Sequence, residues 1–367
     1  MKTRKIIHLI TTIERGGAEN QLLILVNEQI NQGFKVEIIY LKGNQELKKD
    51  FEDLGIKINN RVANRKFIKQ VVYLRNYFTN NKSLVHAHLP RSEVMAFLTL
   101  KKNSYIITRH NYEQFWPGMP KLFSSVLSRL VCSKAAGGIA ISKALKEYLI
   151  HNSEVSKYFP LEVVYYGYGK KQEPKADTDE KLLKLRSLSL NGFKIGIISR
   201  LVPGKDYPTL FKALKLVLVK NDKIKLLIVG DGTQKQYLRD LSKKMGIESN
   251  VVWLGKIDFT SEFLSALDLF VFTSRGEGFG LVLLEAMKAL KPILATNNSA
   301  IPEVLGEKYE GLFKTGNHVE LAGKIIKAIE VKDYSTELVK SYLPQLEIFN
   351  PQVMASKTIE IYEYYGF

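Results

Sequence analysis

The chain has 367 residues, a length that suits two domains, each with enough residues for a hydrophobic core. Its composition, 45% hydrophobic and 25% charged, excludes a disordered or fibrous protein, and its formal net charge is +17. Cys132 is the single cysteine, which excludes an internal disulfide or a cysteine zinc cluster and fits the reducing cytoplasm.

The first twelve residues begin with basic side chains and continue with an apolar run, which superficially resembles a secretion signal. That run, residues 6–10, is too short, contains His8 and is followed by no small-residue cleavage site. Residues 5–11 are therefore expected to form a buried strand. No apolar run approaches the roughly 20 residues that span a bilayer, so any membrane contact is expected to be peripheral.

Short apolar runs alternate with amphipathic stretches through residues 1–170, which is the pattern of parallel α/β units. These residues are expected to form one domain. The candidate strands are 5–11, 36–41, 56–59, 84–88, 105–109, 138–141 and 161–165.

A polar segment, residues 171–191, follows and is expected to be a linker. It contains Asp177-Thr178-Asp179, an Asp-x-Asp pattern known from metal-binding enzymes, but this pattern does not stand at a strand end and predicts no metal site here. A second alternating series, residues 192–350, predicts another domain. Its candidate strands are 194–199, 225–229, 251–254, 269–273, 292–295 and 311–313.

This α/β pattern predicts two doubly wound parallel-sheet domains. Ligands of such sheets bind at the carboxyl ends of strands, where loops meet the starts of helices. The predicted active site is therefore the cleft between the two domains.

A glycine-spaced turn between a strand and a helix, residues 275–285, is the most informative segment. Glycines at alternate positions let the backbone approach a ligand, and free amides from Gly280 to Val282, at the helix start, suit phosphate oxygens. Glu277 and Glu285 frame this anion site. Because carboxylates repel phosphate, both are expected to accept hydrogen bonds from sugar or ribose hydroxyls.

The segment 199–207 also connects a strand to a helix, and it carries two cations, Arg200 and Lys205. A diphosphate needs such countercharge, above all when it leaves a sugar. The segment is not a P-loop, because Ser199 replaces the first glycine and Asp206 replaces the required Ser or Thr.

Two positions in the first half also lie at strand ends. Gly16 and Gly17 follow the first strand, and His110 follows the fifth, where a histidine either hydrogen-bonds a reacting sugar or phosphate or is a structural residue. His86 and His88 are interpreted as structural.

The positive charge is concentrated in the first half: residues 1–170 contain 26 Lys and Arg against 13 Asp and Glu, and the remainder contains 28 against 24. Such a surface attracts polyanions, either nucleic acid or an anionic membrane. Apolar residues at helical spacing lie in the same half and indicate either a membrane-surface helix or a buried core helix. They are Phe115, Trp116, Met119, Leu122, Phe123, Val126, Leu127 and Leu130.

Together these motifs resemble the family 4 glycosyltransferases, whose GT-B architecture has two Rossmann-like domains facing each other across a cleft. The resemblance runs essentially end to end. It is carried by the Glu277-x7-Glu285 pattern, Gly230-Asp231-Gly232, Trp253-Leu254-Gly255 and Ile301-Pro302-Glu303-Val304. It implies a retaining hexosyltransferase without a metal or other cofactor, and a C-terminal helix, 351–367, that packs back toward the N-terminal domain.

The resemblance also implies roles for individual residues. The catalytic set would be His110, Glu277, Arg200 and Lys205, with Glu285 on the donor ribose, and the departing diphosphate would take the acceptor proton. The donor-binding set would be Gly16, Gly17, Arg200, Lys205, Gly230, Lys256, Ile257, Glu277, Gly278, Phe279, Gly280, Leu281, Val282 and Glu285. The chain departs from many relatives at Tyr166-Gly167-Tyr168-Gly169, where acceptor contacts are expected to differ.

The expected reaction is transfer of a hexose or N-acetylhexosamine, from a UDP-sugar ahead of GDP-mannose, to a lipid-linked or membrane-associated glycan acceptor in surface polysaccharide synthesis. The basic N-terminal domain would bind the inner face of the cell membrane, leaving the protein cytoplasmic and peripheral. A soluble small-molecule acceptor is the alternative. Neither a nucleic-acid-binding motif nor a Gly-x-Gly-x-x-Gly dinucleotide motif is present, so nucleic acid is not an expected partner.

Overall fold

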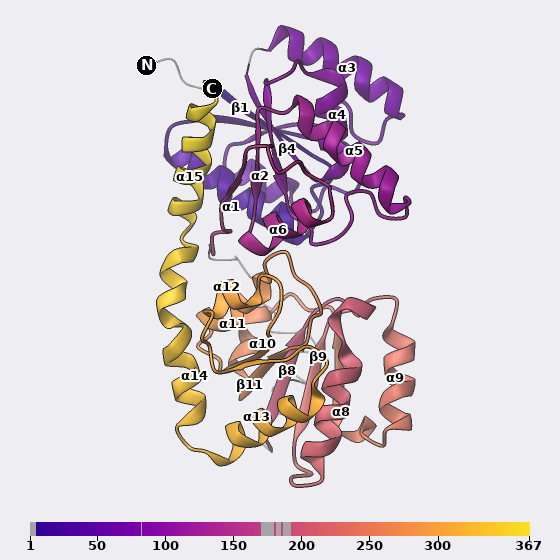
Figure 1. Cartoon of the computed structure of the whole chain (residues 1–367), viewed down its shortest axis with the longest axis vertical. Coiled ribbons are helices and arrows are strands. Elements are labelled where there is room, and N and C mark those ends of the chain that lie inside the picture. Colours follow the sequence, from indigo (N-terminus) through magenta and orange to yellow (C-terminus); the bar gives the residue numbers. More distant parts are fainter. Residues whose placement is uncertain (1–4, 82, 170–179, 181–184, 186–191) are drawn as a thin grey trace. The chain divides into compact units, whose positions relative to one another are not determined.

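The structure is a computed structural model that describes residues 5–81, 83–169, 180, 185 and 192–367 (Figure 1). The chain divides into two compact units, Met1–Gly169 with Ile348–Phe367, and Lys170–Glu347. The predicted linker, residues 171–191, lies outside the described residues apart from positions 180 and 185, and Asp177-Thr178-Asp179 lies wholly outside them.

The first unit contains a seven-stranded sheet among its described residues, with the order β3-β2-β1-β4-β5-β6-β7 and every pairing parallel. The strands are β1 (Lys5–Ile10), β2 (Lys35–Tyr40), β3 (Lys57–Asn59), β4 (Leu84–His88), β5 (Tyr105–Arg109), β6 (Gly137–Ala140) and β7 (Leu161–Val163). The helices are α1 (Gly17–Asn31), α2 (Lys48–Asp53), α3 (Phe67–Asn80), α4 (Pro90–Thr99), α5 (Lys121–Lys134), α6 (Lys143–His151) and α15 (Pro351–Tyr364).

The second unit contains a six-stranded parallel sheet among its described residues, with the order β10-β9-β8-β11-β12-β13. The strands are β8 (Lys194–Ile198), β9 (Lys225–Val229), β10 (Val251–Gly255), β11 (Leu269–Phe272), β12 (Ile293–Thr296) and β13 (Leu312–Phe313). The helices are α8 (Tyr207–Leu218), α9 (Lys235–Lys244), α10 (Thr260–Ser265), α11 (Leu281–Lys288), α12 (Ile301–Leu305), α13 (His318–Glu330) and α14 (Tyr334–Tyr342). The described residues also contain three 3₁₀ helices, η1 (Pro203–Lys205), η2 (Glu248–Asn250) and η3 (Leu343–Phe349).

The predicted fold class, two Rossmann-like units with parallel sheets, is confirmed. Each candidate strand is present, and its ends differ from the expected ones by at most two residues. The strands were recognisable because a parallel sheet is covered on both faces, so its strands are nearly continuous apolar runs. Residues 5–11, for example, contain β1, a central strand whose residues from Ile6 to Ile10 are all buried.

The C-terminal helix α15 packs on α1 within the first unit (Figure 1). The Gln29 side-chain amide on α1 donates to the Tyr362 hydroxyl on α15 at 3.2 Å. The segment before α15 is held as well, since the Tyr168 amide donates to the Phe349 carbonyl at 2.8 Å. A Cβ at Gly167 would overlap the backbone of Pro351, so only glycine fits this close contact.

Helix α5 buries serines and exposes apolar side chains. Ser124 accepts a hydrogen bond from the Trp116 amide at 2.9 Å, and Ser128 donates to the Glu154 carbonyl at 2.6 Å, so the buried face is used for hydrogen bonding. The exposed face carries Leu122, Phe123, Val126 and Leu130. The apolar stripe of this helix therefore does not belong to the core of the unit.

A buried ion cluster anchors the end of β5. Arg109 is 4% exposed, and its Nε lies 2.9 Å from Glu93 Oε2 on α4. A second carboxylate, Glu154, lies 3.8 Å from Arg109 Nη1, and the guanidinium stands 4.3 Å from the centre of the Phe115 ring. Burial, together with the charge of Glu154, outweighs the attraction of Arg109 and raises the pKa of Glu93 to about 7.

No helix among the described residues is both long enough and apolar enough to cross a membrane.

We predict that folding stability falls as the pH rises toward 7, because Glu93 then takes on charge in a buried site. Its folded-state pKa is raised, so its contribution is fully present below the unfolded pKa of about 4.5 and is lost as the pH rises through about 7. Glu93→Gln should remove this component, on the order of 3 kcal/mol between pH 4.5 and 8.

Thermal unfolding at several pH values measures the effect, with Glu113→Gln, an exposed carboxylate of the same unit, as the control. An unchanged pH slope in the Glu93→Gln variant would contradict the assignment.

Candidate functional site

In the second unit, the strand order reverses between β8 and β11, which are neighbours in the sheet. The loops after these two strands leave the same edge and pass to helices on opposite faces, which opens a crevice where ligands of such sheets bind. The loop after β8 carries Arg200 and Lys205, and the loop after β11 carries Glu277. The topology therefore brings the two predicted segments to one crevice.

Hydrogen bonds fasten the two loops to each other. The Thr273 hydroxyl donates to the Lys205 carbonyl at 2.7 Å, and the Arg275 amide donates to the Gly204 carbonyl at 2.8 Å. The loop after β12 supports them, since Ser299 accepts from the Glu277 amide at 2.9 Å. These hydrogen bonds hold the backbone of the loops in place and thereby fix where the side chains of Lys205 and Glu277 begin.

Lys205 and Glu277 form an ion pair across the crevice, and both side chains are largely buried. The Lys205 ammonium also lies 5.5 Å from the centre of the Phe272 ring. A ligand with a negative charge and hydroxyl groups would suit both partners, because it replaces the carboxylate beside Lys205 and supplies donors to Glu277.

Helix α11 begins at the same crevice. Gly280, with φ of +88°, precedes its first residue, Leu281, and turns the chain into the helix. The amides at this helix start lie at the positive end of the helix dipole, a position that favours anions. Phe279 is buried beneath the turn, and Glu285 is half-buried on the helix.

A pocket of about 390 Å³ lies beside the loop after β9. Gly230 and Lys256 line it, whereas Ile257 is not among its lining residues, and Arg200 is exposed on the neighbouring loop. Gly230 has φ of +138°, and a Cβ there would overlap the Ser199 carbonyl oxygen. Its immediate role is thus to let the loops after β8 and β9 touch.

The sequence reasoning missed Asp206 as a support. Its side chain is buried, accepts from the Thr209 hydroxyl at 2.8 Å, and lies 3.1 Å from Arg275 Nε. Asp206 adopts a left-handed conformation, φ 48°, which Asp tolerates better than most residues. The signal was present in the sequence as an Asp between the loop cation Lys205 and a helix start.

The other predicted site residues belong to the first unit. Gly16 caps α1 and Gly17 begins it. The Glu19 side chain folds back to Gly16, where a Cβ would overlap it, and accepts from the Thr12 hydroxyl at 2.5 Å. Burial raises the pKa of Glu19, and the hydrogen bond from Thr12 opposes this shift.

His110 lies at the end of β5 and contributes to a pocket of about 350 Å³ within the first unit. Lys42, Arg91 and Trp116 contribute to the same pocket. Its lining also contains Arg109 and the carboxylates of Glu93, Glu113 and Glu154, so the histidine lies beside an aromatic surface and charges of both signs.

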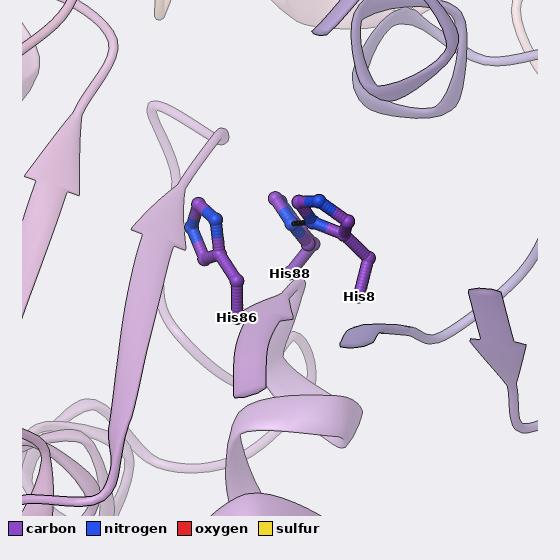
Figure 2. Close-up of side chains that lie close together, drawn as sticks. All are labelled: His8, His86 and His88. Atoms are coloured by element: carbon purple, nitrogen blue, oxygen red, sulfur yellow. Dashed lines mark hydrogen bonds between the residues drawn. The ribbon is translucent and has the colours of Figure 1, made fainter. Parts of the chain in front are cut away.

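His110 does not stand alone. The Tyr166 hydroxyl lies 2.5 Å from His110 Nδ1, and His88 Nδ1 lies 3.1 Å from His110 Nε2. Figure 2 shows His88 beside His8 and His86, which come from β1 and β4. The sequence reasoning treated His86 and His88 as structural and did not connect them to His110, because that connection requires the register of three strands.

His8, His86 and His88 would satisfy the spacing for a metal ion, since their ring nitrogens lie within 4.8 Å of one another (Figure 2). Each of these nitrogens, however, already has a hydrogen-bond partner in the protein. The contacts of His8 are His88 and Gln29, those of His88 are His8 and His110, and those of His86 are Tyr362 and Thr108. The group is satisfied as a hydrogen-bonded cluster.

Two family models match the chain. The model for glycosyl transferases group 1 matches residues 181–341, and the model for glycosyltransferase family 4 matches residues 15–168.

Individual proteins match as well. The chain is 24% identical to the capsular polysaccharide biosynthesis glycosyltransferase CapM of Staphylococcus aureus, over 90% of this chain and 88% of CapM. It is 27% identical to the uncharacterized glycosyltransferase MJ1069 of Methanocaldococcus jannaschii, over 65% of this chain, and spans 62% of the length of that relative. A crystal structure of Anabaena HepE with UDP and glucose shares the fold, with a TM-score of 0.79 and 21% identity, over 98% of this chain and 100% of HepE.

We predict that Gly230→Ala lowers the stability of the protein by about 2–4 kcal/mol, because the new Cβ meets a backbone oxygen at a strained φ. Gly204→Ala is the matched control on the adjoining loop, with open space around its Cβ and no positive φ, and should stay within about 0.5 kcal/mol of the unaltered protein. Thermal unfolding measures both. Equal losses in the two variants would show that Gly230 has no special packing role.

Proposed function

The chain belongs to the family 4 glycosyltransferases, and we propose that it moves a hexose or N-acetylhexosamine from a nucleotide-diphosphate sugar to a lipid-linked or membrane-associated glycan acceptor in surface polysaccharide synthesis. A UDP-sugar is the favoured donor ahead of GDP-mannose. The name of CapM, which refers to capsular polysaccharide, supports the pathway, and the UDP and glucose in the crystal structure of HepE support the donor.

The observation that carries the donor assignment is the Lys205–Glu277 pair at the start of α11. We assign the diphosphate to Lys205, Arg200 and the first amides of α11, and the sugar hydroxyls to Glu277. Glu285 would hold the ribose. On binding, the donor would replace the Lys205–Glu277 ion pair with two contacts. Its diphosphate would contact Lys205, and its sugar hydroxyls would contact Glu277.

The pocket beside Gly230 and Lys256 would take the nucleoside base. Gly16 and Gly17, which the sequence predicts to approach the donor phosphates, belong to the first unit. The proposed chemistry is retaining and needs no metal, because Arg200 and Lys205 supply the countercharge that the leaving diphosphate requires. The diphosphate would itself accept the proton of the attacking hydroxyl, so that the protein mainly positions the sugar and stabilises the leaving group.

For the acceptor, we assign the pocket lined by His110, Lys42, Arg91 and Trp116. Lipid-linked sugars carry phosphate next to the glycan, and two cations suit that group. Trp116 offers an apolar face to a sugar ring.

The membrane assignment rests on the outer face of α5. Phe123 is 65% exposed and Leu122 is 72% exposed, with Lys121 and Arg129 on the same helix. Helix α3, which packs on α4 as α5 does, adds Ile68 at 76% exposure. Apolar side chains with basic neighbours on a positively charged unit suit insertion into the headgroup region of an anionic bilayer.

We predict that the protein binds UDP or GDP and slowly hydrolyses one matching nucleotide sugar. Lys205→Ala should weaken binding of the nucleoside diphosphate by about ten-fold or more, because a charge-assisted contact is lost. Glu277→Gln should reduce turnover and leave nucleoside diphosphate affinity within about two-fold.

Calorimetry with UDP, GDP and NAD, combined with a donor-hydrolysis screen, measures these effects. Lys212→Ala, an exposed lysine on α8, is the control and should bind like the unaltered protein. Binding of NAD alone would refute the assignment.

We also predict binding to anionic vesicles at low salt, weakened by added salt. Replacing Leu122 and Phe123 by serine should weaken it by about ten-fold or more, since the loss of buried apolar area exceeds 1.4 kcal/mol. Replacing Leu216 on α8 and Val219, which follows α8, by serine should have no effect, since both are exposed in the second unit. Vesicle sedimentation measures all three proteins. If the unaltered protein does not bind, the acceptor is a soluble molecule.

A further inference from the structure

A line of hydrogen bonds runs from α1 through the first sheet to His110. Gln29 Oε1 lies 2.8 Å from His8 Nε2, and His8 Nδ1 lies 2.9 Å from His88 Nε2. His88 Nδ1 then lies 3.1 Å from His110 Nε2, and His110 Nδ1 lies 2.5 Å from the Tyr166 hydroxyl. The strands set this line: β1 and β4 pair His8 with His86, and His88 stands two residues further along β4.

The imidazoles in this line are neutral at physiological pH. Burial lowers the pKa of His8 to about 4 and that of His110 to about 3, and it holds the pKa of His88 well below its ordinary value. A neutral imidazole has one N–H donor and one bare nitrogen acceptor. The nitrogen that one histidine leaves bare therefore determines which nitrogen of the next histidine must carry the proton.

The Gln29 side chain determines which atom donates in each hydrogen bond of this line. Its Oε1 can only accept, so His8 carries its proton on Nε2 and leaves Nδ1 bare. His88 must then donate from Nε2 to His8, and His110 must donate from Nε2 to His88. The only nitrogen left to His110 is a bare Nδ1, which accepts from the Tyr166 hydroxyl.

A second series of hydrogen bonds, through Tyr362 and His86, is consistent with the same orientation of the Gln29 side-chain amide. Its amide nitrogen donates to the Tyr362 hydroxyl of α15 at 3.2 Å, and that hydroxyl lies 2.7 Å from His86 Nδ1. His86 Nε2 lies 2.6 Å from the Thr108 hydroxyl oxygen. With Tyr362 donating, His86 also carries its proton on Nε2. All four histidines thus share the Nε2–H form, which isolated neutral histidine also favours.

We propose that Gln29, His8 and His88 are positioning residues that fix the Nε2–H form of His110 and keep its Nδ1 as a hydrogen-bond acceptor. A sugar hydroxyl that reaches His110 must then donate to Nδ1, in the place that the Tyr166 hydroxyl occupies here. The role in turnover rests on the proposed function, whereas the form of the imidazoles does not.

The form of each histidine is measured directly by two-bond ¹H–¹⁵N spectra of the histidine-labelled full chain at pH 7. We expect His8, His86, His88 and His110 to be neutral and protonated on Nε2. Any of the four in the Nδ1–H or charged form overturns the proposal. Adding Zn²⁺ should leave these signals unchanged, and a stoichiometric shift of the His8 and His88 signals would identify a metal site instead.

Gln29→Met tests the direction, because it removes the acceptor at the start of the line. The His110 spectrum should then show the Nδ1–H form in part or in full. We expect kcat for sugar transfer to fall by about ten-fold or more, as when a catalytic histidine takes the wrong form, while nucleoside diphosphate affinity stays within about two-fold. Gln32→Met, at the exposed end of α1, is the matched control and should change neither quantity.

The outcomes separate the two proposals. If kcat falls in Gln29→Met but the His110 spectrum stays unchanged, Gln29 has only a structural role and the inference is wrong. If the unaltered protein turns over no nucleotide sugar, the proposed function fails, yet the spectra still decide the form of His110. Because an Nδ1–H or charged His110 in the unaltered chain would already overturn the proposal, the proposal stays falsifiable even if the variant folds poorly.

Discussion

In each unit, every described strand runs parallel to its neighbours, and this constraint determines where chemistry can occur. The carboxyl ends of all strands meet at one edge, and the reversal of strand order separates two loops at its centre. In the second unit these are the loops of Lys205 and Glu277, which are joined by hydrogen bonds to the carbonyls of Lys205 and Gly204. In the first unit the same reversal places His8 of β1 beside His86 of β4. The positions of the Lys205–Glu277 pair and of the histidine line thus both depend on the reversal of strand order in a parallel sheet.

The strands and the donor-side motifs could be predicted because they are local in sequence. A buried parallel strand is a continuous apolar run, and the glycine-spaced turn from 275 to 285 carries its cations and carboxylates within a short stretch or on one neighbouring loop. The orientation of α5 could not be predicted in the same way. Its pattern defines an apolar stripe, but the stripe faces outward because Ser124 and Ser128 satisfy backbone groups near Trp116 and Glu154. Those partners are set by tertiary packing.

The histidine line lay beyond sequence reasoning for a related reason. His8, His88 and His110 come from three strands, and their contact depends on the exact register of the sheet. Gln29 lies on a helix and gives no sign in the sequence that its amide faces an imidazole. The sequence departs from the family at Tyr166, which predicts different acceptor contacts, and the structure gives that tyrosine a direct partner in His110.

The first unit is discontinuous in sequence, since Ile348–Phe367 joins Met1–Gly169. During synthesis, the first unit therefore waits for α15 until the whole second unit has been made. Domains generally fold in order as they emerge from the ribosome, and here the earlier unit would emerge with a gap along α1 where α15 belongs. Tyr362, which accepts from the Gln29 amide, follows the second unit in the sequence. The second unit can therefore complete its fold before the first does, and the histidine line reaches its final arrangement only after α15 has packed on α1.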